Sequence, residues 1–555
     1  MKKRLKRGVF VPAAAIFVAA GATVAQNADD GSDFQFAPGS LVLTTSNYVG
    51  SASTVKPGEV LPLGCAGGAD GSTNVAVPTF ALDVSIIVNV PCGFASDRGK
   101  APHASDPHNV WNNSNTDGSF GVSSPIVLDN LTTDGVLLGA LPVPTDKIVT
   151  SFSSKSELAI NLSVDGKSLT FMGYHGGPGC GGYPVSPTAP NLIDVSASNT
   201  PAVCDPTNPV ITSFEGGYPT AYYRAVAEVD AGGKISITDG NAYSGDNGRA
   251  VMKGGNGFYY MAGNDNSGNL PKSALCYAPT PQTASSCTLI GTQLVNSTGV
   301  ELLVPGAVPP VPSNIAMIGR LQFGKDKPGK DTNFRGLTIF NNTLYVSKGS
   351  GGNGVNTVYQ VGSAGTLPTG TAAQLATVAI SILPGFPQSG TSTFPFGLFF
   401  ANATTLYVCD EGDETLVTPA VNGNVADAST LATAGVQKWS LVNGSWTMLY
   451  VLQNGLNIGV PYSVPTYPAS LNPAADGCRN MTGKVNQDGT VDIYAITSTV
   501  SANGDQGADP NKLVKVTDLL SATTLPAGPN LGIFTTLRSA QAGEVFRGVA
   551  VAPTE

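Results

Sequence analysis

The fold follows from one stretch of the chain, Phe334-Arg335-Gly336-Leu337-Thr338-Ile339-Phe340-Asn341-Asn342-Thr343-Leu344-Tyr345-Val346. On both sides of the Asn-Asn pair, apolar side chains recur at every second position. This alternation is typical of half-buried strands, and two such runs separated by turn-forming residues favour a tight connection. The stretch therefore predicts a β-hairpin.

The same kind of hairpin recurs along the chain. Copies begin near residues 157, 249, 335, 396, 479 and 547, and a second, weaker hairpin follows most of them. Examples of the second hairpin are 225–229 with 234–238, 436–441 with 446–452, and 513–516 with 534–537. Four antiparallel strands, repeated radially, form the blades of a β-propeller. We expect an all-β, six-bladed β-propeller; the alternatives are a seventh blade within 290–330 and a sandwich of unrelated hairpins.

The last copy predicts how the ring closes. Residues 547–552 form an innermost strand with no partner after it. Residues 39–45 can supply the missing second strand, and 126–128 with 136–141 can supply the outer two. We therefore expect one propeller domain over 26–555, with a closing blade from about 39–145 plus 546–552.

Composition supports this class. The 555 residues include 67 Gly and 40 Pro, and only 12% are charged. So many turn-forming residues disfavour a helical protein, and so few charges exclude a disordered chain or a coiled coil.

The N-terminus reads as a signal peptide over residues 1–25. A basic segment, 2–7, precedes an apolar run over 8–24, and small residues stand before Gln26. A retained membrane anchor is the alternative. Cleavage removes five basic and no acidic residues and takes the net charge from −9 to −14, which disfavours nucleic acid as a partner. We expect a secreted protein, extracellular or periplasmic, without a membrane span and acting as a monomer.

Long connections gather on one face of the predicted propeller. The connections between the second and third strands of a blade are long, for example 175–222 and 410–434, whereas the turns on the opposite face are mostly short. We call the first side the loop-rich face. Eight cysteines in an exported chain indicate disulfides, of which 105 pairings are possible. The expected pairs are Cys65–Cys92, Cys180–Cys204, Cys276–Cys287 and Cys409–Cys478.

Four arginines occupy one equivalent position at the start of the innermost strands. They are Arg249, Arg335, Arg479 and Arg547, and the other two copies have Glu157 and Phe396 there. Guanidinium groups converging on one channel mouth can bind a carboxylate in a bidentate manner. Alternatively, each arginine pairs with an acidic residue just upstream, namely Asp246, Asp331, Asp476 or Glu544.

Two further sets of residues are candidates on the loop-rich face. Oxygen-rich loops can hold Ca²⁺, so Asp410, Asp413, Asp331 and Asp246 are candidate ligands, with solvated turn residues as the alternative. His175 is the best-placed general acid or base, with Tyr174 and Arg224 as candidate catalytic neighbours.

The stretch 334–346 resembles the repeats of secreted β-propeller proteins, most of them uncharacterised, and this resemblance extends from about 150 to the end of the chain. Propellers that cleave uronate-containing polysaccharides are similar in outline, with Arg, Tyr and His at one face. Trp-Asp, Kelch and sialidase-type motifs are missing from the sequence. The resemblance implies the fold and not the reaction. Two functions remain: binding or cleavage of an acidic polysaccharide or other anionic ligand, and a non-catalytic extracellular scaffold.

Overall fold

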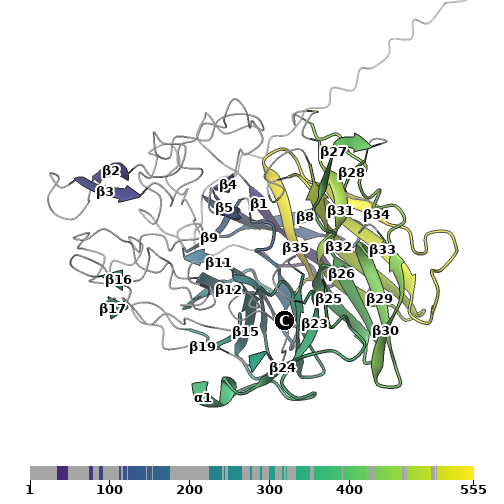
Figure 1. The fold of residues 1–555 in the computed structure, drawn as a ribbon, viewed down its shortest axis with the longest axis horizontal. Helices are drawn as coiled ribbons and strands as arrows, with labels where there is room; N and C mark the ends of the chain where they lie inside the picture. Colours follow the sequence, from purple (N-terminus) through teal and green to yellow (C-terminus); the bar gives the residue numbers. More distant parts are fainter. Residues whose placement is uncertain are drawn as a thin grey trace, which may run out of the picture. The chain divides into compact units, whose positions relative to one another are not determined.

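The computed structural model describes residues 34–47, 123–175, 224–264, 299–306, 333–349 and 355–555, apart from short gaps within them, together with short strand segments between these ranges. Almost all regular structure in these residues is β, in six sheets of four or more strands. The sheets are arranged as the blades of a six-bladed β-propeller (Figure 1). The predicted fold class is confirmed.

Each blade places consecutive strands side by side, and the innermost strand comes first in every blade but the last. The first blade holds β10 (Asn161–Leu162), β11 (Ser168–His175), β12 (Arg224–Asp230) and β13 (Ile235–Gly240), with β9 (Ile148–Ser151) and β6 (Ser123–Ser124) extending it beyond β11. The second holds β14 (Gly248–Lys253), β15 (Tyr259–Gly263), β18 (Val300–Leu303) and β19 (Ile315–Met317). The third holds β21 (Leu337–Phe340), β22 (Thr343–Lys348), β23 (Thr357–Val361), β24 (Ala379–Ile382) and β20 (Arg320–Leu321).

The remaining blades follow the same order. The fourth holds β25 (Pro395–Asn402), β26 (Thr405–Asp410), β29 (Gly435–Val442) and β30 (Ser445–Leu452). The fifth holds β31 (Ala474–Val485), β32 (Thr490–Val500), β33 (Lys512–Leu519) and β34 (Thr535–Ser539). The closing blade holds β35 (Glu544–Val551), β1 (Leu41–Asn47), β7 (Ile126–Leu131) and β8 (Leu137–Pro142).

Small elements complete the described residues. Four two-stranded pairs are β2 (Asn74–Pro78) with β3 (Ile87–Pro91), β4 (Asn112–Asn113) with β5 (Asp117–Gly121), β16 (Cys276–Tyr277) with β17 (Thr288–Leu289), and β27 (Leu416–Val421) with β28 (Asn424–Ala426). One short helix, α1 (Ala372–Leu375), lies between β23 and β24. Among the described residues, no helix has the length and apolar character needed to cross a membrane.

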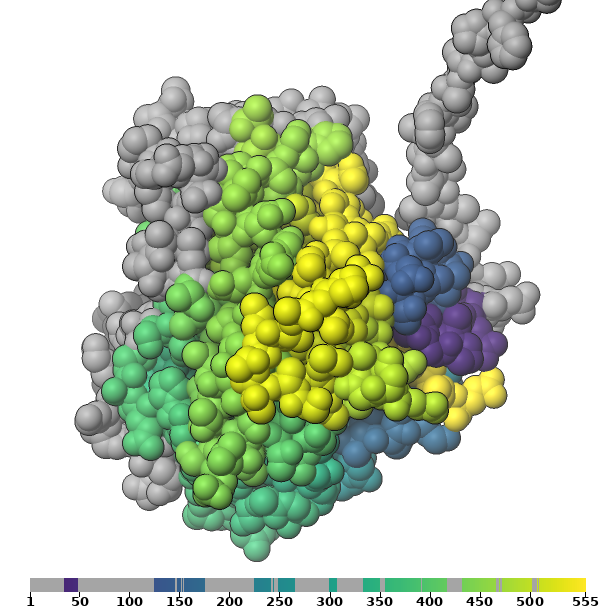
Figure 2. All heavy atoms as spheres, turned by 90° about the vertical axis from the view of Figure 1, so that its right-hand side faces the viewer, coloured from purple at the N-terminus to yellow at the C-terminus, as the bar shows by residue number. Residues whose placement is uncertain are grey.

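The innermost strands form a continuous ring. Contacts run from β35 to β10, β14, β21, β25 and β31 in turn, and from β31 back to β35. The ring closes as predicted, because β35 pairs with β1 in antiparallel register and Val549 lies opposite Leu43. Figure 2 shows the purple N-terminal strand next to the blue residues of β7 and β8 and to the yellow C-terminal residues. The strands near residues 300–317 belong to the second blade, which leaves six blades and not seven.

Neighbouring innermost strands approach each other very closely. A Cβ atom added to Gly336 would lie 1.9 Å from the carbonyl oxygen of Phe396, and one added to Gly548 would lie 2.6 Å from that of Leu158. The corresponding Asn480 donates a hydrogen bond to the carbonyl oxygen of Arg547, and Ala159 forms a parallel bridge with Ala250. In the four blades that carry an arginine, the residue that follows it is therefore small or, as Asn480, hydrogen bonds to the neighbouring strand.

The hydrophobic core lies between adjacent blades. Between the second and third blades, for example, Tyr260 and Phe334 pack with Val346, and all three are fully buried. Between the fifth and closing blades, Tyr494 packs with Leu43 and Phe546. Every blade therefore depends on its neighbours for the burial of its sheet faces.

A buried hydroxyl group, that of Thr44, contributes to closure and gives the first prediction. Thr44 Oγ1 accepts a hydrogen bond from Gly548 N at 2.7 Å and donates one to Leu158 O at 2.9 Å. Thr44→Val keeps the shape and leaves two buried backbone groups without that partner. We expect the free energy of unfolding to fall by about 1–3 kcal/mol. Chemical denaturation measures it, with Thr535→Val in the exposed strand β34 as the control; equal effects of the two substitutions would contradict this role.

Candidate functional site

The four arginines at equivalent positions are all buried at the same end of the innermost strands. Their relative exposures are 3% for Arg249, 4% for Arg335, 3% for Arg479 and 2% for Arg547. This end lies on the loop-rich face, because Pro395 at the start of β25 pairs with Asp410 at the end of β26, where the long 411–434 connection begins. The equivalent arginines are thus buried at the end of the innermost strands that carries the long connections.

Each arginine reaches across a boundary between blades. Arg249 Nε donates to Ser156 Oγ at 2.9 Å, and its Nη1 donates to Phe334 O at 2.8 Å and to Asn333. Arg547 donates to the carbonyl oxygen of Phe152 in the first blade. These bonds tie neighbouring blades together, and the alternative pairing with acidic residues just upstream stays a prediction.

Arg335 and Arg479 lie beside the loop that follows β26. Arg479 Nε donates to Glu411 Oε2 at 3.0 Å, and its Nη2 donates to Glu414 Oε1 at 2.6 Å. The Arg335 guanidinium carbon lies 5.8 Å from the centre of the Phe396 ring. Asp476, the upstream residue in this blade, accepts a hydrogen bond from Glu414 N at 2.8 Å. Asp246 and Asp331 lie outside the described residues.

Lys155 completes this group, and sequence reasoning missed it. Its ammonium group forms an ion pair with the second carboxylate oxygen of Glu414, Oε2. The Lys155 side chain is 23% exposed and that of Glu414 is 14% exposed, whereas Arg479 and Glu411 are exposed by only 4% and 3%. The Lys155–Glu414 pair therefore lies on the solvent side, with the buried charges behind it. We call Lys155, Arg249, Arg335 and Arg479 the cation cluster.

The charges of the cation cluster act strongly on one another. Burial lowers the pKa of Lys155 to about 7; Glu411 opposes this shift, whereas the arginines at 335, 479 and 249 add to it. Burial alone would raise the pKa of Glu411, but Arg335, Lys155 and Arg479 hold it below the usual range. The nearby cations thus keep Glu411 ionised despite its burial, whereas burial is the main cause of the low pKa of Lys155.

Strained backbone occurs at three described residues, two of which lie near the arginines. Among the described residues other than glycine, only Leu158, Tyr243 and Glu414 combine a positive φ, of 61°, 54° and 55°, with a side chain other than Asn. Left-handed backbone is costly for such residues and is often found at functional sites. Leu158 follows Glu157, the Tyr243 carbonyl accepts from Arg224, and Glu414 pairs with Lys155.

A second group gathers around Glu157. The Tyr174 hydroxyl donates to Glu157 Oε1, and Thr150 Oγ1 donates to Oε2 at 3.2 Å. The Arg224 guanidinium carbon lies 4.5 Å above the centre of the Tyr174 ring. The structure thus brings together two of the three predicted catalytic residues with Glu157. His175 is the last residue of β11, where its backbone pairs with Ile148, and the position of its side chain is outside the described part.

The acidic loop is held by its own hydrogen bonds. The Asp410 carboxylate accepts from Phe394 N at 3.0 Å, from Gly412 N at 3.0 Å and from Gln437 Nε2 at 2.8 Å, and burial raises its pKa to about 7. Asp413 accepts from Thr415 N at 3.0 Å. Within the described residues, no three His, Cys, Asp or Glu side chains gather as metal ligands. Calcium binding stays a prediction.

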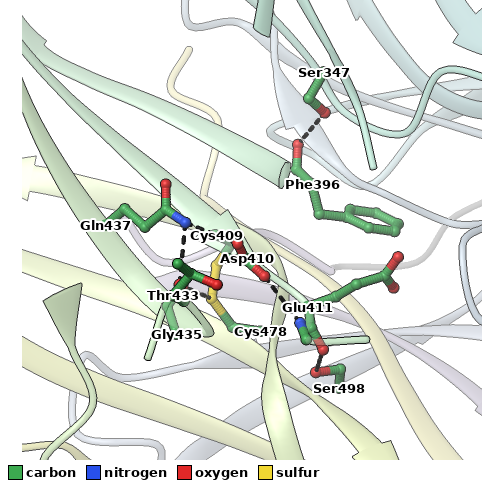
Figure 3. Close-up of a disulfide and its surroundings, with 11 residues drawn as sticks. Ser347, Phe396, Cys409, Asp410, Glu411, Thr433, Gly435, Gln437, Cys478 and Ser498 are labelled. Atoms are coloured by element: carbon green, nitrogen blue, oxygen red, sulfur yellow. Dashed lines mark hydrogen bonds between the residues drawn. A yellow bond between two sulfur atoms is a disulfide. The ribbon is translucent and has the colours of Figure 1, made fainter. Parts of the chain in front are cut away.

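A disulfide holds this loop against the next blade. The predicted Cys409–Cys478 bond is confirmed, and it joins the end of β26 to β31. Figure 3 shows the disulfide beside Asp410 and Glu411, with Ser498 donating to the Glu411 carbonyl oxygen. Cys478 directly precedes Arg479, so the bond fixes Glu411 and Arg479 at neighbouring positions. The other three predicted pairs lie outside the described residues.

Comparison with known proteins gives likeness of fold alone. No family model and no curated protein matches the chain. Solved structures that align with it include a glucose dehydrogenase, at 12% identity over 67% of this chain and 89% of that chain, with a TM-score of 0.29. The parainfluenza virus 5 hemagglutinin-neuraminidase ectodomain aligns at 9% identity over 77% and 76%, with a TM-score of 0.27. Trypanosoma rangeli sialidase aligns at 9% identity over 78% and 57%, with a TM-score of 0.28.

The Lys155 amine should react unusually well at neutral pH. Because its pKa is about 7, most of the amine is uncharged and nucleophilic just above neutrality. With a trace amount of an acetylating reagent, we expect the rate of Lys155 acetylation to level off above about pH 8, one unit above that pKa. Competitive labelling with mass spectrometry measures this, with the exposed Lys234 as the reference. A Lys155 profile that runs parallel to the Lys234 profile up to alkaline pH would contradict the assignment.

Lys155 should also contribute to the pH dependence of stability. Its pKa in the folded protein, about 7, lies below the ordinary lysine value, so between these limits only the unfolded chain carries the proton. The free energy of unfolding therefore rises with pH from about 7 to about 10.4. Below pH 7 both states carry the proton, so Lys155 adds no further pH dependence there. Denaturant unfolding of the parent and of Lys155→Gln measures it. The difference between the two should grow in favour of the parent across the window, and a constant difference would refute the prediction.

Proposed function

We propose that the protein binds an acidic polysaccharide at its loop-rich face, through the cation cluster. The observation that carries this proposal is the position of Lys155. Its side chain is 23% exposed, and its ammonium group lies in the field of Arg249, Arg335 and Arg479. An anionic group that approaches Lys155 from solvent therefore meets buried arginines, of which Arg479 already pairs with Glu411 and Glu414.

The charge of the whole chain strengthens the choice of ligand. A propeller of net charge about −14 after export would repel polyanions over most of its surface. A cationic mouth in such a protein favours a ligand with spaced, single carboxylates, such as a chain of uronate residues. Guanidinium groups suit these carboxylates, because they offer two parallel N–H donors.

The group around Glu157 is the part of the face where cleavage would take place. The Tyr174 hydroxyl is already hydrogen bonded to Glu157, and Arg224 covers its ring. Cleavage would require His175 to act as the general acid or base beside Tyr174. We therefore propose binding as the core function and cleavage as the part that depends on His175. The predicted signal peptide supports a secreted location for both, and calcium would act in loops next to the site.

The bonds of Arg249 and Arg547 across blade boundaries favour a second function. An arginine that only holds blades together would leave the propeller as a rigid extracellular scaffold. The two functions differ in one outcome, namely whether charge at the mouth controls the binding of a ligand.

Binding of oligogalacturonate tests the proposal. We expect Lys155→Gln and Arg335→Gln each to weaken binding by about ten- to a hundredfold, the loss of one charged hydrogen bond. Titration calorimetry measures this, with circular dichroism to verify folding.

Lys253→Gln is the matched control, because Lys253 is 26% exposed and pairs with Glu228, away from the mouth. A neutral dextran should not bind. If the parent binds oligogalacturonate and both mouth variants bind it equally well, the cation cluster only holds the blades together and the scaffold function is favoured.

A further inference from the structure

The carboxylate of Glu414 occupies the place that a ligand carboxylate would take. Its oxygen Oε1 accepts from Arg479 Nη2 at 2.6 Å, and its oxygen Oε2 pairs with the Lys155 ammonium group. One carboxylate thus bridges the buried and the solvent-facing members of the cation cluster. This is the arrangement expected of a bound uronate.

Glu414 differs from its neighbour Glu411 in its backbone conformation and in its exposure. Glu414 has a left-handed backbone, at φ 55°, for which its side chain gives no steric reason. Its neighbour Glu411 pairs with the same arginine, but it is almost fully buried and its backbone carbonyl is held by Ser498. Two carboxylates therefore share Arg479: Glu411 is almost fully buried, whereas Glu414 is 14% exposed on a left-handed backbone whose N–H donates to Asp476.

We propose that Glu414 is a resident stand-in for the ligand, and that a carboxylate from solvent binds between Lys155 and Arg479 by replacing it. The proposal rests on the proposed function for the identity of the natural ligand, but not for the carboxylate site itself. Replacement leaves the charge balance of the cluster unchanged, because one carboxylate leaves as another enters. It also lets the strained backbone of Glu414 relax, so part of the cost of opening the site is returned.

This arrangement makes the apparent affinity depend on how often Glu414 leaves its place. A ligand that binds only the open form binds more weakly, in proportion to the fraction of open molecules. Competition with Glu414 therefore lowers the apparent affinity, so that single carboxylates bind too weakly to replace it. A polymer binds with higher affinity and replaces Glu414 more readily, because its neighbouring residues add contacts along the loop-rich face.

Rescue by a small carboxylate tests the proposal on the full mature chain. Glu414→Ala removes the stand-in and leaves room beside Lys155 and Arg479, so its melting temperature should fall. Acetate at about 0.1 M should then raise that temperature by about 2–4 °C more than sodium chloride of equal ionic strength does. The measurement is made at about pH 6, where Lys155 carries its proton.

Glu228→Ala is the matched control, because Glu228 in the first blade is 19% exposed, pairs with Lys253 at 2.6 Å and accepts a hydrogen bond from the Tyr259 hydroxyl. Acetate should not stabilise this variant or the parent beyond the effect of chloride. Equal responses of all three proteins would overturn the proposal.

Glu414→Gln tests the proposal if the alanine variant does not fold, because it preserves the shape of the side chain and removes its charge. It should bind oligogalacturonate about tenfold more tightly than the parent, and weaker binding would overturn the proposal. If acetate rescues Glu414→Ala while neither the parent nor Glu414→Gln binds oligogalacturonate, the carboxylate site stands and the polysaccharide function fails.

Discussion

The close approach of the innermost strands is the constraint on which the rest of the structure depends. Around the axis, the residue after each arginine position faces the backbone of the next blade, where Gly336 and Gly548 leave no room for a side chain. Successive side chains of a strand point to opposite sides, so the position before it is turned away from that contact. The same constraint that keeps one position small therefore leaves its neighbour free to carry a large charged group at the mouth of the channel.

The charged mouth in turn follows from the ring of strands. Polar groups at this depth are stable only with partners, and the partners come from adjacent blades. Arg249 takes Ser156 from one side and Phe334 from the other, while Arg479 takes Glu411 from the loop of the previous blade. The disulfide at Cys409 and Cys478 holds that loop in register with the strand that carries Arg479. The side chains that brace the blades are thus the ones to which we assign the proposed binding.

Local patterns made the fold predictable, and distance along the chain made much of the site unpredictable. The alternation in 334–346 and the unpaired strand at 547–552 were enough to predict hairpins, closure and the Cys409–Cys478 pair. The equivalence of the arginines was also visible, because repeats preserve position. Lys155 belongs to no repeat position, and Glu414 lies 259 residues away from it. Nothing in the sequence near either residue indicates the other, and the buried bonds of Asp410 were hidden for the same reason.

Closure by the first and last strands has a consequence for the order in which the molecule is made. The hydroxyl of Thr44 and the amide of Gly548 that it binds are 504 residues apart in sequence. Strand β1 emerges from the ribosome long before β35 and has to wait for it, so the ring stays open while the intervening blades form. Loop-closure entropy makes so distant a pairing slow. Until synthesis reaches β35, β1 exposes an edge that could pair with another chain, and a chaperone that shields it would protect the yield of folded protein.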